Sequence, residues 1–368
     1  MRLKEIEITP CVLKLRQPVQ NASTAFHERH SLLIRLVAED GRCGRGEVTP
    51  LPEFGTESLG PSQLSLELAA KRLRDRELPA SAQEVDQLLA EIGDWTSRPA
   101  ARFGLELGLL DLASQSANLR LSRFLNPSAI TSVEVNALLT GSEPEELAQE
   151  ASAAVREGYR VLKVKVAGRA LADDARRLFA VRRQVGERIK IRVDANGQWS
   201  EAEAAIALRG FSPLKLELCE QPVAASNHAA LRRLRWLVPC AIAADEALGE
   251  KGAVDALLDA EDGPIASILV LKPTVLGGML PALRIAQRAE RIGVGTYVTS
   301  ALDGVVARLG AAHLAAALPS NGWASGLGVG QLFANGLDAD PYAPKGGRIQ
   351  LSDQPGLGLG ANWSQAAT

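Results

Sequence analysis

Six ionisable residues stand at or near the C-terminal ends of short apolar segments that are rich in β-branched residues. They are Lys163, Lys165, Asp194, Glu220, Asp245 and Lys272. From Lys165 to Lys272 the successive positions are 29, 26, 25 and 27 residues apart, a spacing that fits one strand with one crossover helix. Charges are costly inside buried parallel strands unless they are paired or bind a ligand. The pattern therefore indicates an active site at the ends of consecutive strands.

Three of these residues, Asp194, Glu220 and Asp245, are carboxylates on successive segments. Neighbouring strands lie about 4.8 Å apart, so carboxylates at one height would meet, and their repulsion would oppose ionisation of all three. A hard divalent cation removes this conflict, and oxygen ligands without Cys or His favour Mg²⁺ or Mn²⁺ over zinc. The alternative is that each acid separately caps a helix or pairs with an arginine, which does not explain the repeated position.

The lysines would lie on either side of such a cation. Lys163 and Lys165 are two residues apart and share one face of a strand, with Lys165 nearer its C-terminal end. Lys272 follows a later strand and would lie opposite. A buried lysine beside another cation is a usable base, so this set suits removal of a proton next to a substrate carboxylate, with the enediolate stabilised by the cation. Lys163 is explained equally well as an ion-pair partner of Asp194.

Repeated strand–helix units surround these residues and predict an α/β fold. Strands are expected to begin near residues 133, 161, 189, 214, 242, 265 and 295, with a short eighth at 322–327. Amphipathic helices are expected at residues 144–158, 170–185 and 280–292. Gly158 and Gly293 would end two of these helices. Eight such units describe a TIM barrel, whose active site lies at the C-terminal strand ends.

The N-terminal third has a different pattern, with strands followed by helices. Strands are expected at residues 2–14, 31–39 and 43–48, and helices at 63–78, 82–92 and 100–117. The final stretch is rich in Gly and Pro and is expected to pack back onto this part. We therefore predict an α+β capping domain from residues 1–130, completed by 327–368, and a modified TIM (β/α) barrel at 131–326.

Composition excludes several classes of protein. The net charge of −2 over 368 residues gives no electrostatic footprint for nucleic acid or an anionic membrane. No apolar stretch approaches the roughly 20 residues of a membrane span, and the N-terminus reads as a strand rather than a signal peptide. Four cysteines without a CxxC pair favour reduced thiols. We expect a cytoplasmic protein that acts on a small-molecule carboxylate, and a homo-oligomer is compatible with the sequence.

Five motifs in order resemble the muconate-lactonising subgroup of the enolase superfamily. They are KVKV at 163–166, VDANGQW at 193–199, EQP at 220–222, DE at 245–246 and LKPTVLGG at 271–278. The resemblance implies a modified barrel with a cap, Mg²⁺ on the three carboxylates, and Lys165 and Lys272 as acid–base residues. Related mandelate-racemase-like enzymes use a histidine near the seventh strand. This chain has none at 295–304, and His228 and His313 are expected to be surface or packing residues.

Within the subgroup the chain is most similar to the o-succinylbenzoate synthase family. The similarity rests on GEVTPLPEFGTESL at 46–59, TSALDG at 299–304, HLAAALP at 313–319 and ASGLGVGQLF at 324–333. The last stretch lacks the Asp-x-Asp with which dipeptide epimerases of this subgroup grip an amine. The implied reaction is a dehydration in menaquinone or phylloquinone biosynthesis. The alternatives are an N-acylamino acid racemase, a dipeptide epimerase or a muconate cycloisomerase, and, outside the family, a Schiff-base lysine enzyme or a non-catalytic binding barrel.

Substrate recognition is expected in loops above the strand ends. The candidate loops are residues 17–29 and 49–58, with Phe54 at the tip of the second. Uncharged groups that could hold the tail of the substrate come from Thr299, Ser300, Ser325 and Gly326. Asn196 and Asp303 are expected to support the site, and Asp303 stands where related enzymes often have Glu.

Overall fold

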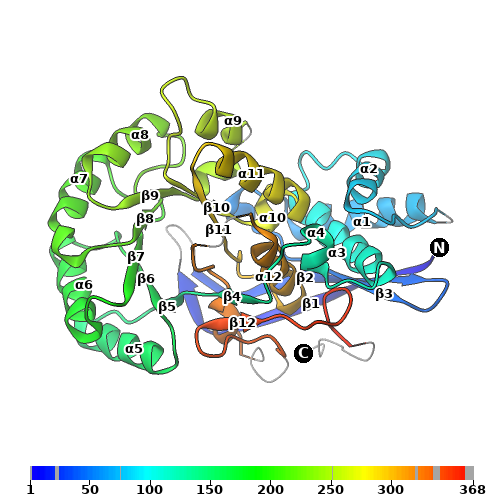
Figure 1. The fold of residues 1–368 in the computed structure, drawn as a ribbon, viewed down its shortest axis with the longest axis horizontal. Helices are drawn as coiled ribbons and strands as arrows, with labels where there is room; N and C mark the ends of the chain where they lie inside the picture. The colour runs from blue at the N-terminus through cyan, green and yellow to red at the C-terminus, as the bar shows by residue number, and fades with distance from the viewer. Residues whose placement is uncertain are drawn as a thin grey trace.

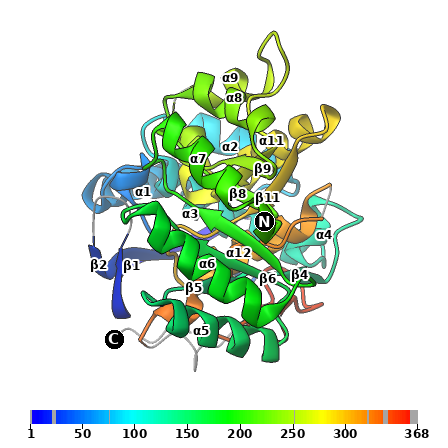
Figure 2. The ribbon, with the colours of Figure 1, turned by 90° about the vertical axis from the view of Figure 1, so that its left-hand side faces the viewer.

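The chain folds into a ring of parallel strands wrapped by helices, with an antiparallel sheet and a second group of helices on one side (Figure 1). The computed structural model describes residues 2–20, 25–74, 76–250, 252–319, 322–334 and 340–360. Figure 2 shows the helices of the ring in front of this second group, which lies behind them. The predicted α/β barrel with an α+β cap is confirmed as the fold class.

The capping part begins with an antiparallel sheet. Its strands are β1 (Leu3–Gln20), β2 (Ala25–Ala38) and β3 (Cys43–Val48), and its helices are α1 (Leu59–Leu73), α2 (Ala82–Ile92), α3 (Pro99–Ser116) and α4 (Leu121–Leu125). Helix α3 packs on β3 at very short range because glycines face each other. A Cβ atom at Gly46 would overlap the carbonyl oxygen of Gly104, and one at Gly104 would overlap Val48. This close contact makes α3 the buried centre of the capping part.

The ring is a seven-stranded parallel sheet. Its strands in order are β5 (Ala137–Leu139), β6 (Val161–Lys165), β7 (Lys190–Asp194), β8 (Leu218–Glu220), β9 (Ala241–Ala244), β10 (Ile268–Leu271) and β11 (Gly295–Val298). The expected eighth strand is reduced to two bridged residues. Ser325 pairs with Val135, and Gly326 pairs with Thr299. A Cβ at position 326 would overlap the Thr299 side chain, so glycine allows this close approach between the two ends of the sheet.

Helices cover the outside of the ring. They are α5 (Pro144–Arg156), α6 (Leu171–Val185), α7 (Glu201–Gly210), α8 (His228–Leu237), α9 (Ala253–Leu258), α10 (Pro273–Leu276), α11 (Met279–Arg291) and α12 (Val305–Ala317). Gly158 and Gly293 follow α5 and α11 with φ of 98° and 72°, a left-handed conformation that glycine adopts without strain. Every residue of α12 is buried, because the capping part covers its outer side.

Two strands predicted for the barrel differ from the structure. The segment near residue 133 forms β4 (Ser132–Glu134), but it pairs with β12 (Arg348–Gln350) from the tail and not with the ring. The strand expected from residue 214 begins only at Leu218, because a 3₁₀ turn precedes it and Lys215 has a φ of 50°. Tail residues also reach the capping part, where Leu121 N donates to Gly356 O at 2.8 Å. The boundaries at residues 130 and 326 stay predictions.

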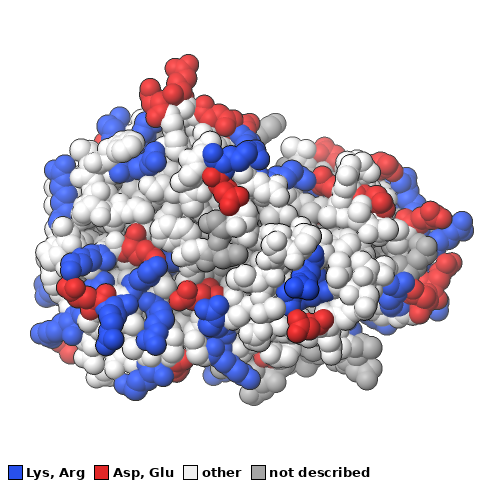
Figure 3. Space-filling model, in the orientation of Figure 1, with Lys and Arg blue, Asp and Glu red and all other residues white. Residues whose placement is uncertain are grey.

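Of the described residues, none belongs to a helix long and apolar enough to cross a membrane. Lysine and arginine side chains predominate at the lower left of Figure 3, over α5 and α6, with some acidic side chains among them. The cysteines Cys11, Cys43, Cys219 and Cys240 are free thiols.

Candidate active site

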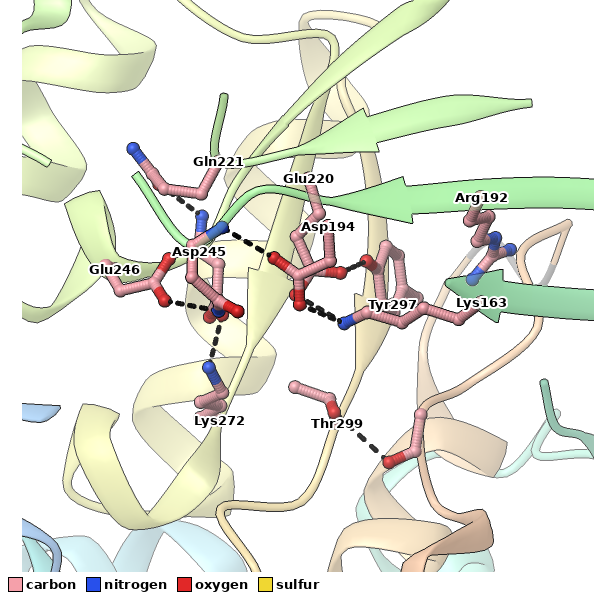
Figure 4. Close-up of polar contacts among 12 residues, drawn as sticks. Lys163, Arg192, Asp194, Glu220, Gln221, Asp245, Glu246, Lys272, Tyr297 and Thr299 are labelled. Atoms are coloured by element: carbon pink, nitrogen blue, oxygen red, sulfur yellow. Dashed lines mark hydrogen bonds and ion pairs between the residues drawn. The ribbon is translucent and has the colours of Figure 1, made fainter. Parts of the chain in front are cut away.

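The six ionisable residues lie together at the C-terminal ends of β6 to β10 and line one pocket. Figure 4 shows all of them except Lys165. Parallel register brings this about, since Lys165 pairs with Asp194 and Asp194 pairs with Glu220. Glu220 pairs with Ala243, so Asp245 lies two residues beyond that level, just after β9. The carboxylates therefore approach one another from three neighbouring strands, although the third stands slightly higher than the sequence suggested.

Lys163 is held between two of the carboxylates. Its Nζ lies 2.9 Å from Asp194 Oδ2 and 2.7 Å from Glu220 Oε1. Burial alone would lower the pKa of the Lys163 ammonium, but the charges of Asp194 and Glu220 raise it well above its ordinary range. Lys163 is thus a fixed cation in the structure. This geometry favours the ion-pair role that the sequence left open for it.

Lys272 approaches the cluster from a different direction (Figure 4). Its ammonium forms an ion pair with Asp245 and lies 4.4 Å from the centroid of the Phe54 ring, at a distance typical of a cation–π contact. Burial works against the charged form, but Asp245 and Glu246 outweigh it and raise the pKa of Lys272. Burial also raises the pKa of Asp245 to about 6 in spite of Lys272.

Lys165 differs from the other two lysines. Within the described part of the chain, its ammonium has no hydrogen bond and no ion pair. The residue is partly buried and lines the central pocket beside Leu138 and Asn196. Its backbone is fixed, because Lys165 O accepts a hydrogen bond from Arg177 at 3.2 Å. Lys165 is therefore the amine that is free to meet a substrate.

Gln221 was missed in the sequence, although it belongs to the EQP motif. Its Oε1 accepts hydrogen bonds from Asp245 N at 2.9 Å and Ala247 N at 3.2 Å, and its Nε2 donates to Val223 O at 2.8 Å. Its φ of 37° is uncommon for a residue other than glycine. Gln221 thereby fixes the backbone that carries Asp245.

Tyr297 was also missed, because an aromatic residue in a buried strand reads as ordinary core. Its hydroxyl donates a hydrogen bond to Glu220 Oε2. The buried guanidinium of Arg192 stacks on the same ring at 4.8 Å from its centroid. Glu220 is therefore held from the interior of the barrel by Tyr297 and from β6 by Lys163.

Glu246 adds a fourth carboxylate. Asn196, one of the predicted supporting residues, donates from Nδ2 to Glu246 Oε1 at 3.0 Å, and its backbone N donates to Asp194 Oδ1 at 3.0 Å. The other oxygen, Glu246 Oε2, is buried and lacks a partner among the residues described. Burial raises the pKa of Glu246, and the nearby carboxylates raise it further. Lys272 lowers it, but the net effect is a raised pKa.

The donor chemistry of this cluster fits a hard divalent cation. Four carboxylates meet three lysines, all donors are oxygens, and burial together with Asp194 raises the pKa of Glu220 to about 7. The side chains are nevertheless engaged with Lys163, Tyr297 and Lys272, and no three acidic, His or Cys side chains in the described residues form a ready metal cage. A cation would therefore compete with these lysines for the carboxylate oxygens.

The expected substrate-binding residues are only partly brought together. Phe54, Thr299, Ser300 and Gly326 line the central pocket with the six ionisable residues. Ser325 does not line it, and its backbone instead bonds to Glu134 and Asn136. Asp303, the other predicted supporting residue, lies buried below the pocket. It accepts hydrogen bonds from Thr274 Oγ1 and Ser300 Oγ, each at 3.0 Å, and so holds the turn that carries Ser300.

The two candidate loops differ in structure from the expectation. Strands β1 and β2 extend into residues 17–29, Phe26 reaches the pocket, and residues 21–24 lie outside the described part of the chain. In the second loop, residues Pro52–Phe54 form a 3₁₀ turn that ends at Gly55 with a φ of 87°. This turn places Phe54 over Lys272.

Neither helical histidine takes part in the site. His313 is buried in α12, where Nδ1 accepts a hydrogen bond from Ser122 N at 3.1 Å. Burial lowers its pKa to about 3, so the ring is neutral. His228 begins α8 on the outside of the ring. Both lie where the sequence placed them, on helices and away from the pocket lining.

The pocket continues into a cavity on each side. Beyond Lys165 a cavity of about 770 Å³ reaches across the ends of β5 and β6 to β1. Beyond Lys272 a smaller cavity of about 230 Å³ lies under the Phe54 turn. A small molecule bound at the carboxylates therefore has more room on the Lys165 side.

Comparison with known proteins extends along nearly the whole chain. The family described as Enolase C-terminal domain-like matches residues 146–365. An o-succinylbenzoate synthase from Desulfotalea psychrophila is 31% identical over 369 residues, covering 92% of this chain and 97% of that protein. Muconate cycloisomerase 1 from Pseudomonas putida is 28% identical over 349 residues, covering 94% of this chain and 92% of that protein.

A solved structure shares both the ring and the cap. The dipeptide epimerase from Methylococcus capsulatus, complexed with Mg and the dipeptide L-Arg-D-Lys, matches with a TM-score of 0.87 and 26% identity. The match covers 97% of this chain and 99% of that chain. The chain is thus similar to proteins named for three different reactions.

Proposed function

This chain belongs to the enolase superfamily, and from that premise we propose that it is an o-succinylbenzoate synthase. The reaction is the dehydration of 2-succinyl-6-hydroxy-2,4-cyclohexadiene-1-carboxylate to o-succinylbenzoate, a step in menaquinone or phylloquinone biosynthesis. The observation that carries the proposal is the pair of unlike lysines, free Lys165 and ion-paired Lys272, at one carboxylate cluster. The stretch at residues 324–330 also lacks an acid that would bind a substrate amine.

Lys165 is the base in this proposal. Its unpaired amine takes the proton from the ring carbon that carries the carboxylate, and the electron pair forms the new ring double bond. The hydroxyl group leaves the adjacent carbon and takes the same proton from the Lys165 ammonium, so that it departs as water. Lys165 suits this step because its amine forms no hydrogen bond or ion pair among the described residues, and its positive charge reaches only as far as lowering the pKa of Asp194.

Lys272 is the fixed cation. Its charge, maintained by Asp245 and covered by the Phe54 ring, stabilises negative charge that develops on the substrate. Thr299 and Ser300 add hydroxyl groups to the same pocket wall. The Phe54 turn closes this side, where it excludes water from the reacting atoms.

Asp194, Glu220 and Asp245 would hold Mg²⁺, or Mn²⁺ in its place. When bound, the cation supplies positive charge that binds the substrate carboxylate and stabilises the charge developed there. Lys163, Tyr297 and Gln221 keep the three carboxylates in position. The four-carboxylate cluster and its oxygen-only donors support this assignment.

A direct assay tests the proposal. The purified protein with Mg²⁺ is incubated with the cyclohexadiene substrate, and o-succinylbenzoate is quantified by chromatography. We expect formation that depends on both the metal and Lys165, with Lys165→Ala as the matched inactive control. If the wild-type protein forms no o-succinylbenzoate above the uncatalysed rate, the proposal fails.

The presence of two lysines at one carboxylate cluster also favours one alternative within the superfamily. Two amines at one carboxylate could exchange a proton on either face of an amino acid derivative, as in an N-acylamino acid racemase or a dipeptide epimerase. In D₂O such an enzyme would incorporate deuterium at the α-carbon of an N-acylamino acid or a dipeptide. A muconate cycloisomerase would instead convert muconate, and it would not incorporate deuterium into these amino acid substrates. These substrates therefore separate the alternatives.

A further inference from the structure

The large cavity beside Lys165 has a composition unlike the rest of the pocket. It shares Leu138, Lys165 and Asn196 with the central pocket, so the two spaces are continuous. Its ionisable lining residues are all basic: Arg16, Lys165, Arg169 and Arg177. The lining contains no Asp or Glu among the residues described, and amide side chains such as Gln198 and Gln331 complete it.

Arg177 forms the back of this cavity and is committed to the fold. Its NH1 donates to Lys165 O at 3.2 Å, and its NH2 donates to Gly141 O at 2.9 Å, so it ties the end of β6 to the chain after β5. It is 4% exposed, and its buried Nε has no partner in the part of the structure that is described. The nearest acid, Asp174, lies 3.0 Å from Arg177 and is shared with Arg169 at 3.8 Å.

Positive charge is therefore in excess here. Burial lowers the pKa of Arg177, and the like charge of Arg169 lowers it further. Asp174 faces both guanidinium groups, and Glu143 acts on Arg177 without an ion pair, while Arg16 has no acidic partner among the described residues. Such a cluster is stabilised by an anion that enters the cavity.

Arg16 and Arg169 each have N–H donors left to bind such an anion. Arg16 donates through Nε to Phe333 O at 3.1 Å, and Arg169 donates through NH1 to Ser142 O at 3.0 Å. Each bond holds one exposed guanidinium at the rim of the cavity, while the two terminal nitrogens of Arg16 and NH2 of Arg169 have no partner in the described structure. A planar guanidinium held in this way matches a carboxylate.

We propose that this Arg16–Arg169–Arg177 cavity binds a second carboxylate of the substrate, at the far end of a flexible tail. This inference rests on the proposed function, because the first carboxylate must be at the acidic cluster with its α-carbon facing Lys165. Of the two described cavities beside the cluster, the one on the Lys165 side offers both the room, about 770 Å³, and the positive charge for the second carboxylate. The succinyl carboxylate therefore lies beside β5 and β6, and this replaces the expectation from the sequence that Thr299 and Ser300 hold the tail; both line the central pocket instead.

Binding measurements test this inference separately from turnover. The Mg²⁺-loaded protein is titrated calorimetrically with o-succinylbenzoate and with N-succinyl-L-phenylalanine, which has the same tail on a different head. Each is compared with its tail monoamide, which lacks only the distal charge. The variants are Arg16→Gln and Arg169→Gln, with Arg156→Gln as the control. Arg156 is an exposed arginine on α5 that bonds to Ser152 and lies outside the cavity lining.

We expect at least one dicarboxylate to bind the wild-type protein about tenfold or more tightly than its monoamide, because a charge-assisted hydrogen bond is lost. Arg16→Gln and Arg169→Gln should each reduce this preference, and Arg156→Gln should preserve it. If the wild-type protein shows no preference, or if the preference persists when Arg16 and Arg169 are replaced together, the inference is wrong.

The two proposals fail in distinguishable ways. Formation of o-succinylbenzoate without any arginine-dependent preference would leave the proposed function standing and overturn the second-carboxylate site. An arginine-dependent preference for N-succinyl-L-phenylalanine, with no formation of o-succinylbenzoate, would support the site and overturn the proposed reaction. Circular dichroism of each variant shows that the comparison concerns folded protein.

Discussion

The two sides of the active site differ in charge. Around the smaller cavity on the Lys272 side, the ionisable lining residues other than the lysine are all acidic: Glu53, Asp245, Glu246 and Glu250. Around the larger cavity on the Lys165 side they are all basic. Lys272 is therefore surrounded by carboxylates that keep it charged, and Lys165 shares its cavity with arginines and has no ion pair among the described residues. The two lysines of one pocket are therefore suited to different roles.

The two sides also differ in how their helices begin. On the Lys165 side α7 has a local cap, in which Ser200 and Glu203 bond to each other's backbone N–H groups. On the Lys272 side the caps come from the other part of the chain. Glu106 of α3 accepts hydrogen bonds from the first residues of α11, and Glu47 of β3 accepts from Gly304 and Ala307 at the start of α12.

This difference shows how the capping part and the ring divide the work. The ring next to Lys272 is joined to the capping part through buried carboxylates, and Figure 1 shows α10, α11 and α12 against its helices. The helices of the ring next to Lys165 lie away from the capping part, and they include the locally capped α7 and also α6, whose N-cap residue Ala170 forms no side-chain cap. Attachment to the capping part suits Lys272, which must stay in place as a cation. The side away from the capping part suits a cavity that admits the substrate tail.

Removing the divalent cation should have the largest effect, because in this account the cation binds the substrate carboxylate next to which both lysines act. We expect chelation with EDTA to lower turnover by at least about a thousandfold, with recovery on addition of Mg²⁺. The variants Asp194→Asn, Asp245→Asn and Glu220→Gln should be as inactive as the chelated protein and should remain folded. The measurement is o-succinylbenzoate formation beside circular dichroism, and full activity after exhaustive chelation would remove the metal from the account.

The contrast between the helix caps predicts opposite pH dependences. Burial raises the pKa of Glu47 from an ordinary 4.5 to about 7, although the backbone N–H of Ala307 opposes the shift. Since the folded state holds this proton more tightly, the stability that Glu47 contributes is complete below pH 4.5 and is lost as the pH rises through 7. The loss is roughly 3 kcal/mol over this window.

Urea unfolding of the wild-type protein and Glu47→Gln between pH 4.5 and 8 measures this difference. The wild-type protein should lose stability relative to the variant as the pH rises. The matched control is Glu203→Gln, because hydrogen bonds from Ser200 lower the pKa of exposed Glu203. Its small contribution is present above its unfolded pKa and is lost as the pH falls. Parallel pH curves for wild type and Glu47→Gln would contradict the burial argument.

The Phe54 ring provides a smaller test of the Lys272 side. Phe54→Ala removes the cation–π contact and opens the pocket to water, so we expect KM to rise or kcat/KM to fall by about three- to thirtyfold. Mg²⁺ affinity should not change, because Phe54 is not among the carboxylates or their partners. Phe54→Leu should recover part of the loss that comes from exclusion of water. Unchanged kinetics in Phe54→Ala would place substrate recognition elsewhere.

The sequence predicted the elements that depend on local pattern. Strand β3 and helix α2 begin and end where expected, and the strand–helix period was sufficient to predict the barrel. The pairing of β4 with β12 joins residues far apart in the chain, which no local pattern encodes. The eighth strand was overestimated for a similar reason, because Ser325 and Gly326 bond to two different neighbours instead of forming one ladder.

The same distinction applies to the site. The spacing of charges at strand ends was enough to bring six residues together, because parallel register aligns those ends. It could not show that Tyr297 points its hydroxyl at Glu220 or that Gln221 holds Asp245, since both depend on side-chain direction. The basic cavity was also invisible, because Arg16 and Arg169 are far apart in sequence and each looks like a surface residue.

The central claim is that Lys165 moves a proton while Lys272 supplies a charge. Rates of o-succinylbenzoate formation by arginine and alanine variants at both positions, with saturating Mg²⁺, test it most directly. Arginine keeps its charge but cannot act as a base. Lys165→Arg should be as inactive as Lys165→Ala, about 10²- to 10⁴-fold below wild type, and Lys272→Arg should exceed Lys272→Ala by at least about tenfold. Lys163→Ala should be milder than Lys165→Ala. Turnover by Lys165→Arg well above that of Lys165→Ala would contradict the account.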